Sequence, residues 1–132
     1  MSGDGRRFAL LDEASRSPAQ RRVREAIVRG PRGQVRGPFN ALLRSPELAD
    51  RVQKLGELIR FDGALPPALN ELAILVTARH WGAQFEWHAH HALAIEAGLS
   101  PSIAQAVAER RRPQDMTREE AAVHDFSREL HE

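Results

Sequence analysis

Apolar residues along this chain recur at helical spacings. From Pro46 onward, Leu48, Val52, Leu55 and Ile59 are separated by four, three and four residues, which is one stripe of an amphipathic helix that ends near Gly63. No window alternates apolar and polar residues with the period of two that a half-buried strand requires. The sequence therefore predicts an all-α protein, a single-domain bundle of about six helices.

Helix start signals divide the chain into segments. Ser17 precedes Pro18 and Gln20, and Thr117 precedes Glu120, so both serve as N-caps with a capping box. Further starts are expected at Phe39 (a short turn), Ser45-Pro46, Pro66-Pro67, Ala83 and Ser100-Pro101. We expect Ile103, Ala104 and Val107 to face inward from one helix, and Val123, Phe126 and Leu130 to form the inner stripe of the last one.

The N-terminal residues 1–16 are predicted to be a flexible tail, followed by a helical domain over residues 17–132. Phe8, Leu10 and Leu11 could pin this tail to a surface. The segment contains Arg6-Arg7, but Asp12 and Glu13 interrupt the apolar run that a signal peptide would need. We therefore predict a cytoplasmic protein.

The stretch Glu71–Leu99 is the most apolar part of the chain and also carries four of its six histidines. Its first part is apolar on nearly every side, so a helix from Pro66 to about His80 should be the central buried one. Trp81-Gly82 should break the chain before a further helix that ends at Gly98. Polar side chains in this stretch either have hydrogen-bond or ion-pair partners within the fold or take part in a chemical reaction.

Composition narrows the possible chemistry. The chain has no cysteine, which excludes disulfides, thiolate nucleophiles and Cys-ligated zinc. Its formal net charge of +1 gives no overall attraction to nucleic acid or to an anionic membrane, and the arginines of the first 36 residues are read as a solvated helix face. The longest apolar run, Leu72–Val76, is far shorter than the roughly 20 residues that span a bilayer.

Two acids and one histidine are candidates for proton transfer. Glu71 lies on an otherwise apolar helix stripe, and burial would favour proton exchange at such a carboxylate. Glu86 and His90 are four residues apart, the spacing at which helical side chains meet. Two antiparallel helices joined at Gly82 could bring Glu71 to the same pocket.

Two other interpretations of these residues are open. Glu71 could form a structural salt bridge with Arg79 or Arg60, and His90 could be a satisfied core histidine. His88, His90 and His91 suggest a metal site, but residues two apart point about 200° apart on a helix, so His88 and His90 cannot share one ion. We therefore predict no metal and no other cofactor.

The segment NELAILVTARHWGAQFEWHAHHALAIEAGLS resembles the carboxymuconolactone decarboxylase and alkyl hydroperoxidase D-like family. The likeness rests on an early Glu in one helix, an aromatic-Glu-Trp-x-x-His motif and an Ala-Gly-Leu-Ser helix end, and it is clearest from Gly37 to Arg112. In the hydroperoxidase branch of that family, a Glu is followed after eleven residues by CxxCxxxH. On this chain the Glu is Glu71, the cysteine positions hold Ala83 and Glu86, and the histidine is His90.

The resemblance implies a helical bundle of the alkyl hydroperoxidase D-like type and excludes dithiol peroxidase activity for this chain. The activity that the resemblance still implies is that of a lyase acting on a small lactone or carboxylic acid. Its catalytic pair would be Glu71 and His90, and Glu86, Trp87 and Ala83 would shape the pocket. The alternative is a non-catalytic oligomerisation or small-ligand-binding module that kept the fold.

The resemblance also implies a homo-oligomer, a trimer or hexamer, because the family forms such assemblies. Members of this branch usually continue with further helices after a segment like Thr117–Glu132. We therefore expect that another chain supplies the missing part or that self-association covers an exposed apolar stripe.

Overall fold

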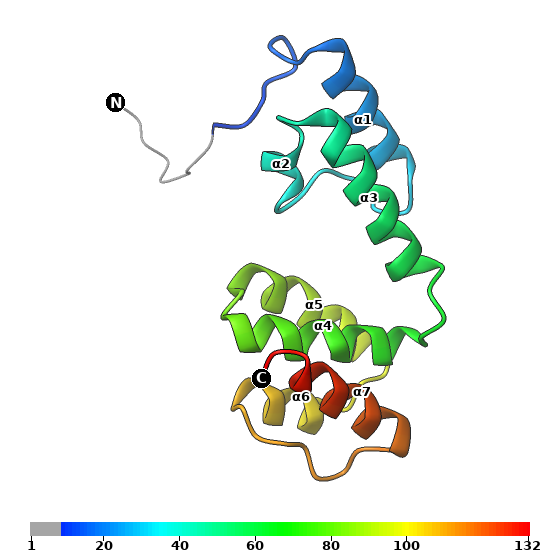
Figure 1. Cartoon of the computed structure of the whole chain (residues 1–132), viewed down its shortest axis with the longest axis vertical. Coiled ribbons are helices and arrows are strands. Elements are labelled where there is room, and N and C mark those ends of the chain that lie inside the picture. The colour runs from blue at the N-terminus through cyan, green and yellow to red at the C-terminus, as the bar shows by residue number, and fades with distance from the viewer. Residues whose placement is uncertain (1–8) are drawn as a thin grey trace. The chain divides into compact units, whose positions relative to one another are not determined.

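The computed structural model describes residues 9–132, which form seven helices and, within that range, no strand (Figure 1). The all-α class is confirmed, and the four-residue helix α2 brings the number to seven. The helices are α1 (Pro18–Arg29), α2 (Phe39–Leu42), α3 (Pro46–Phe61), α4 (Pro67–Trp81), α5 (Gln84–Glu96), α6 (Pro101–Ala108) and α7 (Arg118–Glu129). None of these helices is both long and apolar enough to cross a membrane.

The chain divides into two compact units, the first ending at Gly63 and the second spanning Ala64–Glu132. The tail over residues 1–16 stays a prediction, and Phe8 lies outside the described residues. Of the two other residues expected to pin this segment, Leu11 packs against the core of the first unit, whereas Leu10 is exposed. The Arg16 guanidinium donates to the Leu11 carbonyl at 2.7 Å.

The first unit packs α1 and α2 against α3. Its core consists of Val23, Ile27, Phe39, Leu43 and Ala49. Of the predicted apolar stripe of α3, only Val52 packs against this core, whereas Leu48, Leu55 and Ile59 are all more than half exposed. The buried residues of α3 are Ala49 and Gln53.

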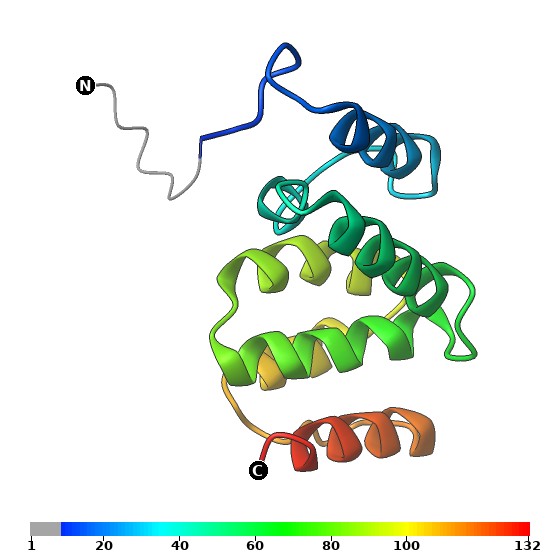
Figure 2. The same cartoon turned by 45° about the horizontal axis from the view of Figure 1, so that its top comes forward.

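The second unit is built around α4, which contacts α5, α6 and α7. Figures 1 and 2 show α4 with α5 on one side and with α6 and α7 on the other. The shared core is formed by Leu72, Leu75, Val76, Ala94, Leu99, Ile103, Ala104 and Val107. The prediction that α4 is the central buried helix is therefore confirmed.

A glycine makes the corner between α4 and α5. Gly82 is the C-cap of α4 and has φ of 64°, a left-handed conformation that a side chain would disfavour. After this corner α5 runs back along α4, as Figure 2 shows. The corner therefore sets which residues of the two helices face each other.

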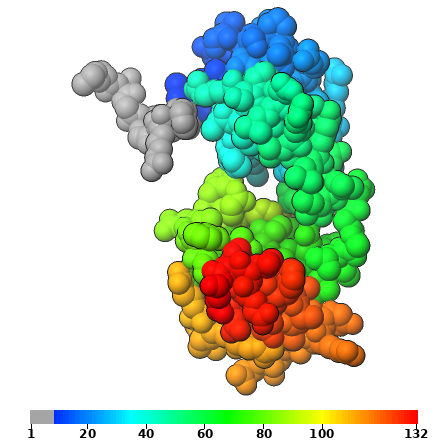
Figure 3. All heavy atoms as spheres, in the orientation of Figure 1, coloured from blue at the N-terminus to red at the C-terminus, as the bar shows by residue number. Residues whose placement is uncertain are grey.

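The last helix begins as predicted but faces differently. The Thr117 side chain accepts from the Glu120 backbone N–H, and the Glu120 carboxylate accepts from the Thr117 backbone N–H, which completes the capping box. The predicted inner stripe is wrong for Phe126 and Leu130, which are 65% and 67% exposed. The buried side of α7 carries His124 and Ser127. In the space-filling view, the red end of the chain forms part of the surface of its own unit (Figure 3).

Candidate active site

Glu71 and His90 meet across the α4–α5 hairpin. The Glu71 Oε2 atom lies 2.6 Å from His90 Nδ1, and the two side chains are only 9% and 10% exposed. The prediction that the Gly82 corner brings them together is confirmed. The contact is as short as a charge-assisted hydrogen bond.

The contact constrains where the proton lies. An ionised carboxylate is only an acceptor, so with Glu71 ionised the His90 Nδ1 atom carries the proton and donates it. If Glu71 is protonated, its O–H donates to Nδ1 instead. In both cases the pair holds one proton between two buried heavy atoms, which is the arrangement that proton transfer requires.

Glu86 lies on the other side of the imidazole ring. Its Oε2 atom is 3.4 Å from His90 Nε2, one helical turn away, as the i,i+4 spacing predicted. This distance exceeds that of a good N–H···O hydrogen bond, so it is a looser ion-pair contact. The Glu86 side chain is 39% exposed and therefore links the buried pair to solvent.

The two remaining predicted pocket residues line a cavity at the α4–α5 corner. This cavity, of about 280 Å³, is bounded by Ala83 and Trp87 together with Ala78, Arg79, Gly82, Gln84 and Ala108. Glu71, Glu86 and His90 do not contribute to its lining. Trp87 also packs against the core of the unit and lies 5.9 Å from the His91 ring. The predicted site thus has two parts, the hydrogen-bonded Glu71–His90 pair and an apolar cavity.

The alternative salt bridge between Glu71 and Arg79 is not formed. Arg79 instead donates from Nε to the Ala108 carbonyl at 2.6 Å, which ties α4 to the end of α6. The alternative with Arg60 stays a prediction. His88 is exposed whereas His90 is buried, which agrees with their placement on different faces.

Residues 9–132 contain no cluster of side chains that is suited to bind a metal ion. No group of three or more His, Asp or Glu side chains in that range is arranged to hold an ion.

A second polar cluster was missed by the sequence reasoning. Buried His124 on α7 has its Nδ1 atom 2.9 Å from the Asp125 carboxylate, which also receives two hydrogen bonds from Arg112. These bonds, those of Arg112 first, hold the pKa of Asp125 well below its usual value. The only sequence signal for this cluster is a histidine within an amphipathic helix. His124 lies between Val123 and Phe126, which the pattern predicts to face inward.

The sequence matches a family model described as the carboxymuconolactone decarboxylase family, over residues 46–124. The matched range begins at the first residue of α3 and includes Glu71, Ala83, Glu86, Trp87 and His90. Searches of curated proteins and of solved structures gave no significant match.

Proposed function

Because this chain belongs to the carboxymuconolactone decarboxylase family, we propose that it is a lyase that decarboxylates a small lactone carboxylic acid by proton transfer at Glu71 and His90. The observation that carries the proposal is the buried 2.6 Å contact between these two side chains. A shared proton in a site shielded from water is suited to general acid catalysis. Dithiol peroxidase activity is excluded because this chain has no cysteine.

The proposed reaction balances without an added cofactor. In a lactone acid of the muconolactone type, the C–C bond to the carboxylate breaks and releases CO₂. The electron pair passes into the conjugated lactone as a dienolate. The Glu71–His90 pair then delivers one proton to a carbon of that dienolate, and the pair recovers its proton from solvent through Glu86.

The residues around the pair have distinct roles in this proposal. Glu71 orients the His90 ring and fixes its tautomer, because its carboxylate faces Nδ1. Glu86 reaches Nε2 from the half-exposed side. The apolar cavity lined by Ala83 and Trp87 would hold the uncharged part of the substrate, and the small side chain of Ala83 leaves room there.

Turnover by matched variants tests the proposal. We expect the wild-type chain to release CO₂ from a lactone acid, and His90→Gln and Glu71→Gln to lose about 100-fold or more in kcat, the usual contribution of general acid–base groups. His88→Gln, which changes an exposed histidine on the same helix, should retain the wild-type rate. Full turnover by both the Glu71 and the His90 variants would contradict the proposal.

A second function is supported by the cavity itself. Its lining includes Ala83 and Trp87 but not the proton-sharing pair, as a small-ligand-binding module without catalysis would have it. This alternative predicts that a lactone acid quenches the Trp87 fluorescence without being consumed. Loss of the substrate, followed by NMR in the same sample, separates the two functions.

A further inference from the structure

We propose that the second unit carries an oxyanion-binding site, separate from the Glu71–His90 pair, that takes a phosphate group. A cavity of about 220 Å³ lies between the end of α4, the segment that follows α6, and α7. Its volume is below the roughly 300 Å³ at which pockets for drug-sized ligands begin, so it suits a small anion. Its polar lining is formed by Arg79, Arg110, Arg111, Arg112, Arg128, His80, His124 and Glu132.

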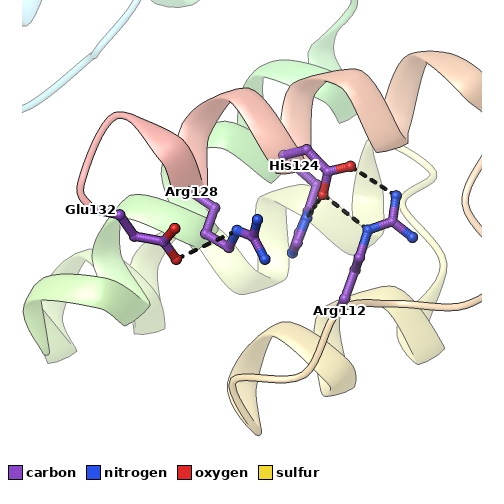
Figure 4. A network of polar contacts seen from close by, with 5 residues as sticks. Arg112, His124, Arg128 and Glu132 are labelled. Carbon is purple, nitrogen blue, oxygen red and sulfur yellow. Dashed lines mark hydrogen bonds and ion pairs between the residues drawn. The ribbon is translucent and has the colours of Figure 1, made fainter.

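The charges of this cavity are strongly unequal. Five arginines line it against one acid, Glu132, which lies 3.5 Å from the Arg128 guanidinium. Outside the lining, Asp125 pairs with Arg112 and Glu109 pairs with Arg111. Figure 4 shows the pairs of Arg112 and of Arg128 on either side of His124. Three of the five arginines therefore have a carboxylate partner.

The other two arginines do not. Arg79 donates from Nε to the Ala108 carbonyl, and Arg110 donates from Nη2 to the Arg79 carbonyl at 3.4 Å. Across residues 9–132 neither guanidinium has an acidic partner. Each guanidinium has five N–H donors, so both keep unused donors together with an uncompensated positive charge. Planar guanidinium groups of this kind bind phosphate oxygens in pairs.

A buried imidazole supplies the polar group at the inner side of the cavity. His124 is only 5% exposed, and its Nδ1 atom faces Asp125. Within the described part of the chain, its Nε2 atom has no hydrogen-bond partner. Because the Nε2 atom is accessible rather than fully buried, it reaches the cavity, where a ligand can contact it. With Nδ1 donating to Asp125, Nε2 accepts a hydrogen bond from a P–OH of hydrogen phosphate when the ring is neutral, and donates to a phosphate oxygen only when the ring is doubly protonated.

The backbone at Arg110 points to the same conclusion. Arg110 is the only non-glycine residue with positive φ in the described chain, at 58°, and it follows the C-cap of α6. Glycine is the usual residue there, because a side chain costs free energy in the left-handed conformation. Arg110 therefore places a guanidinium beside the cavity at a position where glycine would fold better.

Titration calorimetry of the full chain with inorganic phosphate, against sodium chloride of equal ionic strength, tests the site. Wild type should bind one phosphate. Arg110→Gln should weaken binding by about tenfold to 100-fold, the effect of losing one charged hydrogen bond. Arg118→Gln, an equal charge change on the same unit but outside the cavity, should leave the affinity unchanged.

Arg110→Gly separates binding from folding. It should weaken phosphate binding as much as Arg110→Gln does, while its melting temperature should equal or exceed that of wild type, because glycine relieves the positive φ. The His124 ring nitrogen resonances should shift with the same saturation curve as the calorimetric heat. Absence of saturable binding both of inorganic phosphate and of glycerol phosphate, or equal weakening by Arg110→Gln and Arg118→Gln, would overturn the proposal.

A parallel titration with glycerol phosphate identifies the source of the phosphate group. Tighter binding of glycerol phosphate than of inorganic phosphate assigns the site to a phosphorylated small molecule. Equal or weaker binding assigns it to free phosphate, because the ester group then adds no contact. Failure to bind either compound would overturn the site itself.

Discussion

Breaking the Glu71–His90 contact should reveal a large coupling energy between the two side chains. The perturbation is a double-mutant cycle of Glu71→Ala, His90→Ala and the double variant. The cycle is required because each single change also removes any other contact of that side chain, and only the cycle isolates the pair. His88→Ala, on the exposed side of α5, is the matched control.

The magnitude follows from the geometry of the pair. Both side chains are at most 10% exposed and their facing atoms are 2.6 Å apart. Removing one partner of a buried charged pair costs about 3–5 kcal/mol. A hydrogen bond to a charged group contributes about 1.5–3 kcal/mol. The free energy of unfolding should therefore fall in the double variant by about 1.5–3 kcal/mol less than the sum of its decreases in the two single variants.

Urea unfolding followed by tryptophan fluorescence measures these losses where they occur. The only two tryptophans of the chain, Trp81 and Trp87, both lie in the second unit, as does the pair. The signal thus reports the unfolding of that unit. Additive losses, within about 0.5 kcal/mol, would refute the claim that Glu71 and His90 form one interacting pair. His88→Ala should change the free energy of unfolding by no more than about 0.5 kcal/mol.

Three further predictions concern stability and assembly. The hydrogen bonds from Arg112 lower the pKa of Asp125 in the folded state, so its stabilising effect is present above about pH 4 and is lost as the pH falls below that value. The difference in free energy of unfolding between wild type and Asp125→Asn should therefore be constant just above pH 5 and shrink toward pH 2; a difference independent of pH over that range would be inconsistent with this cause. Thr117→Ala removes the N-cap of α7 and should lower the free energy of unfolding by about 1 kcal/mol, whereas Thr117→Ser should cost little. We also propose that the exposed Phe126 and Leu130 help to form a trimer or hexamer, so light scattering should show a mass above that of one chain that falls in a Phe126→Ser/Leu130→Ser double variant. A single-chain mass for wild type would count against this.

The site could be predicted from the sequence where local geometry was sufficient. The spacing of Glu86 and His90 on one helix fixes their proximity, and the glycine corner at Gly82 fixes the antiparallel return of α5. Those two constraints place Glu71 opposite His90. The capping boxes at Ser17 and Thr117 depend only on residues three positions apart, and both predictions are confirmed.

Packing between helices could not be predicted in the same way. Periodicity tells which residues share a face of a helix but not which face meets a neighbour, so the pattern predicts Phe126 inward and does not indicate that His124 is buried. The contact of Arg112 with Asp125 joins residues 13 positions apart through a loop and α7, and no local pattern indicates it. In α3 the buried residues are Ala49 and Gln53, whereas the more apolar Leu48 is exposed.

NMR of the His90 ring nitrogens during titration with a lactone carboxylic acid tests most directly whether the Glu71–His90 pair is a substrate site. The proposal predicts that both ring nitrogen signals shift saturably as ligand is added, that the shift is lost or altered in Glu71→Gln, and that the exposed His88 does not respond. His90 signals that remain unchanged at every ligand concentration would contradict the proposal and identify the pair as part of the packed interior.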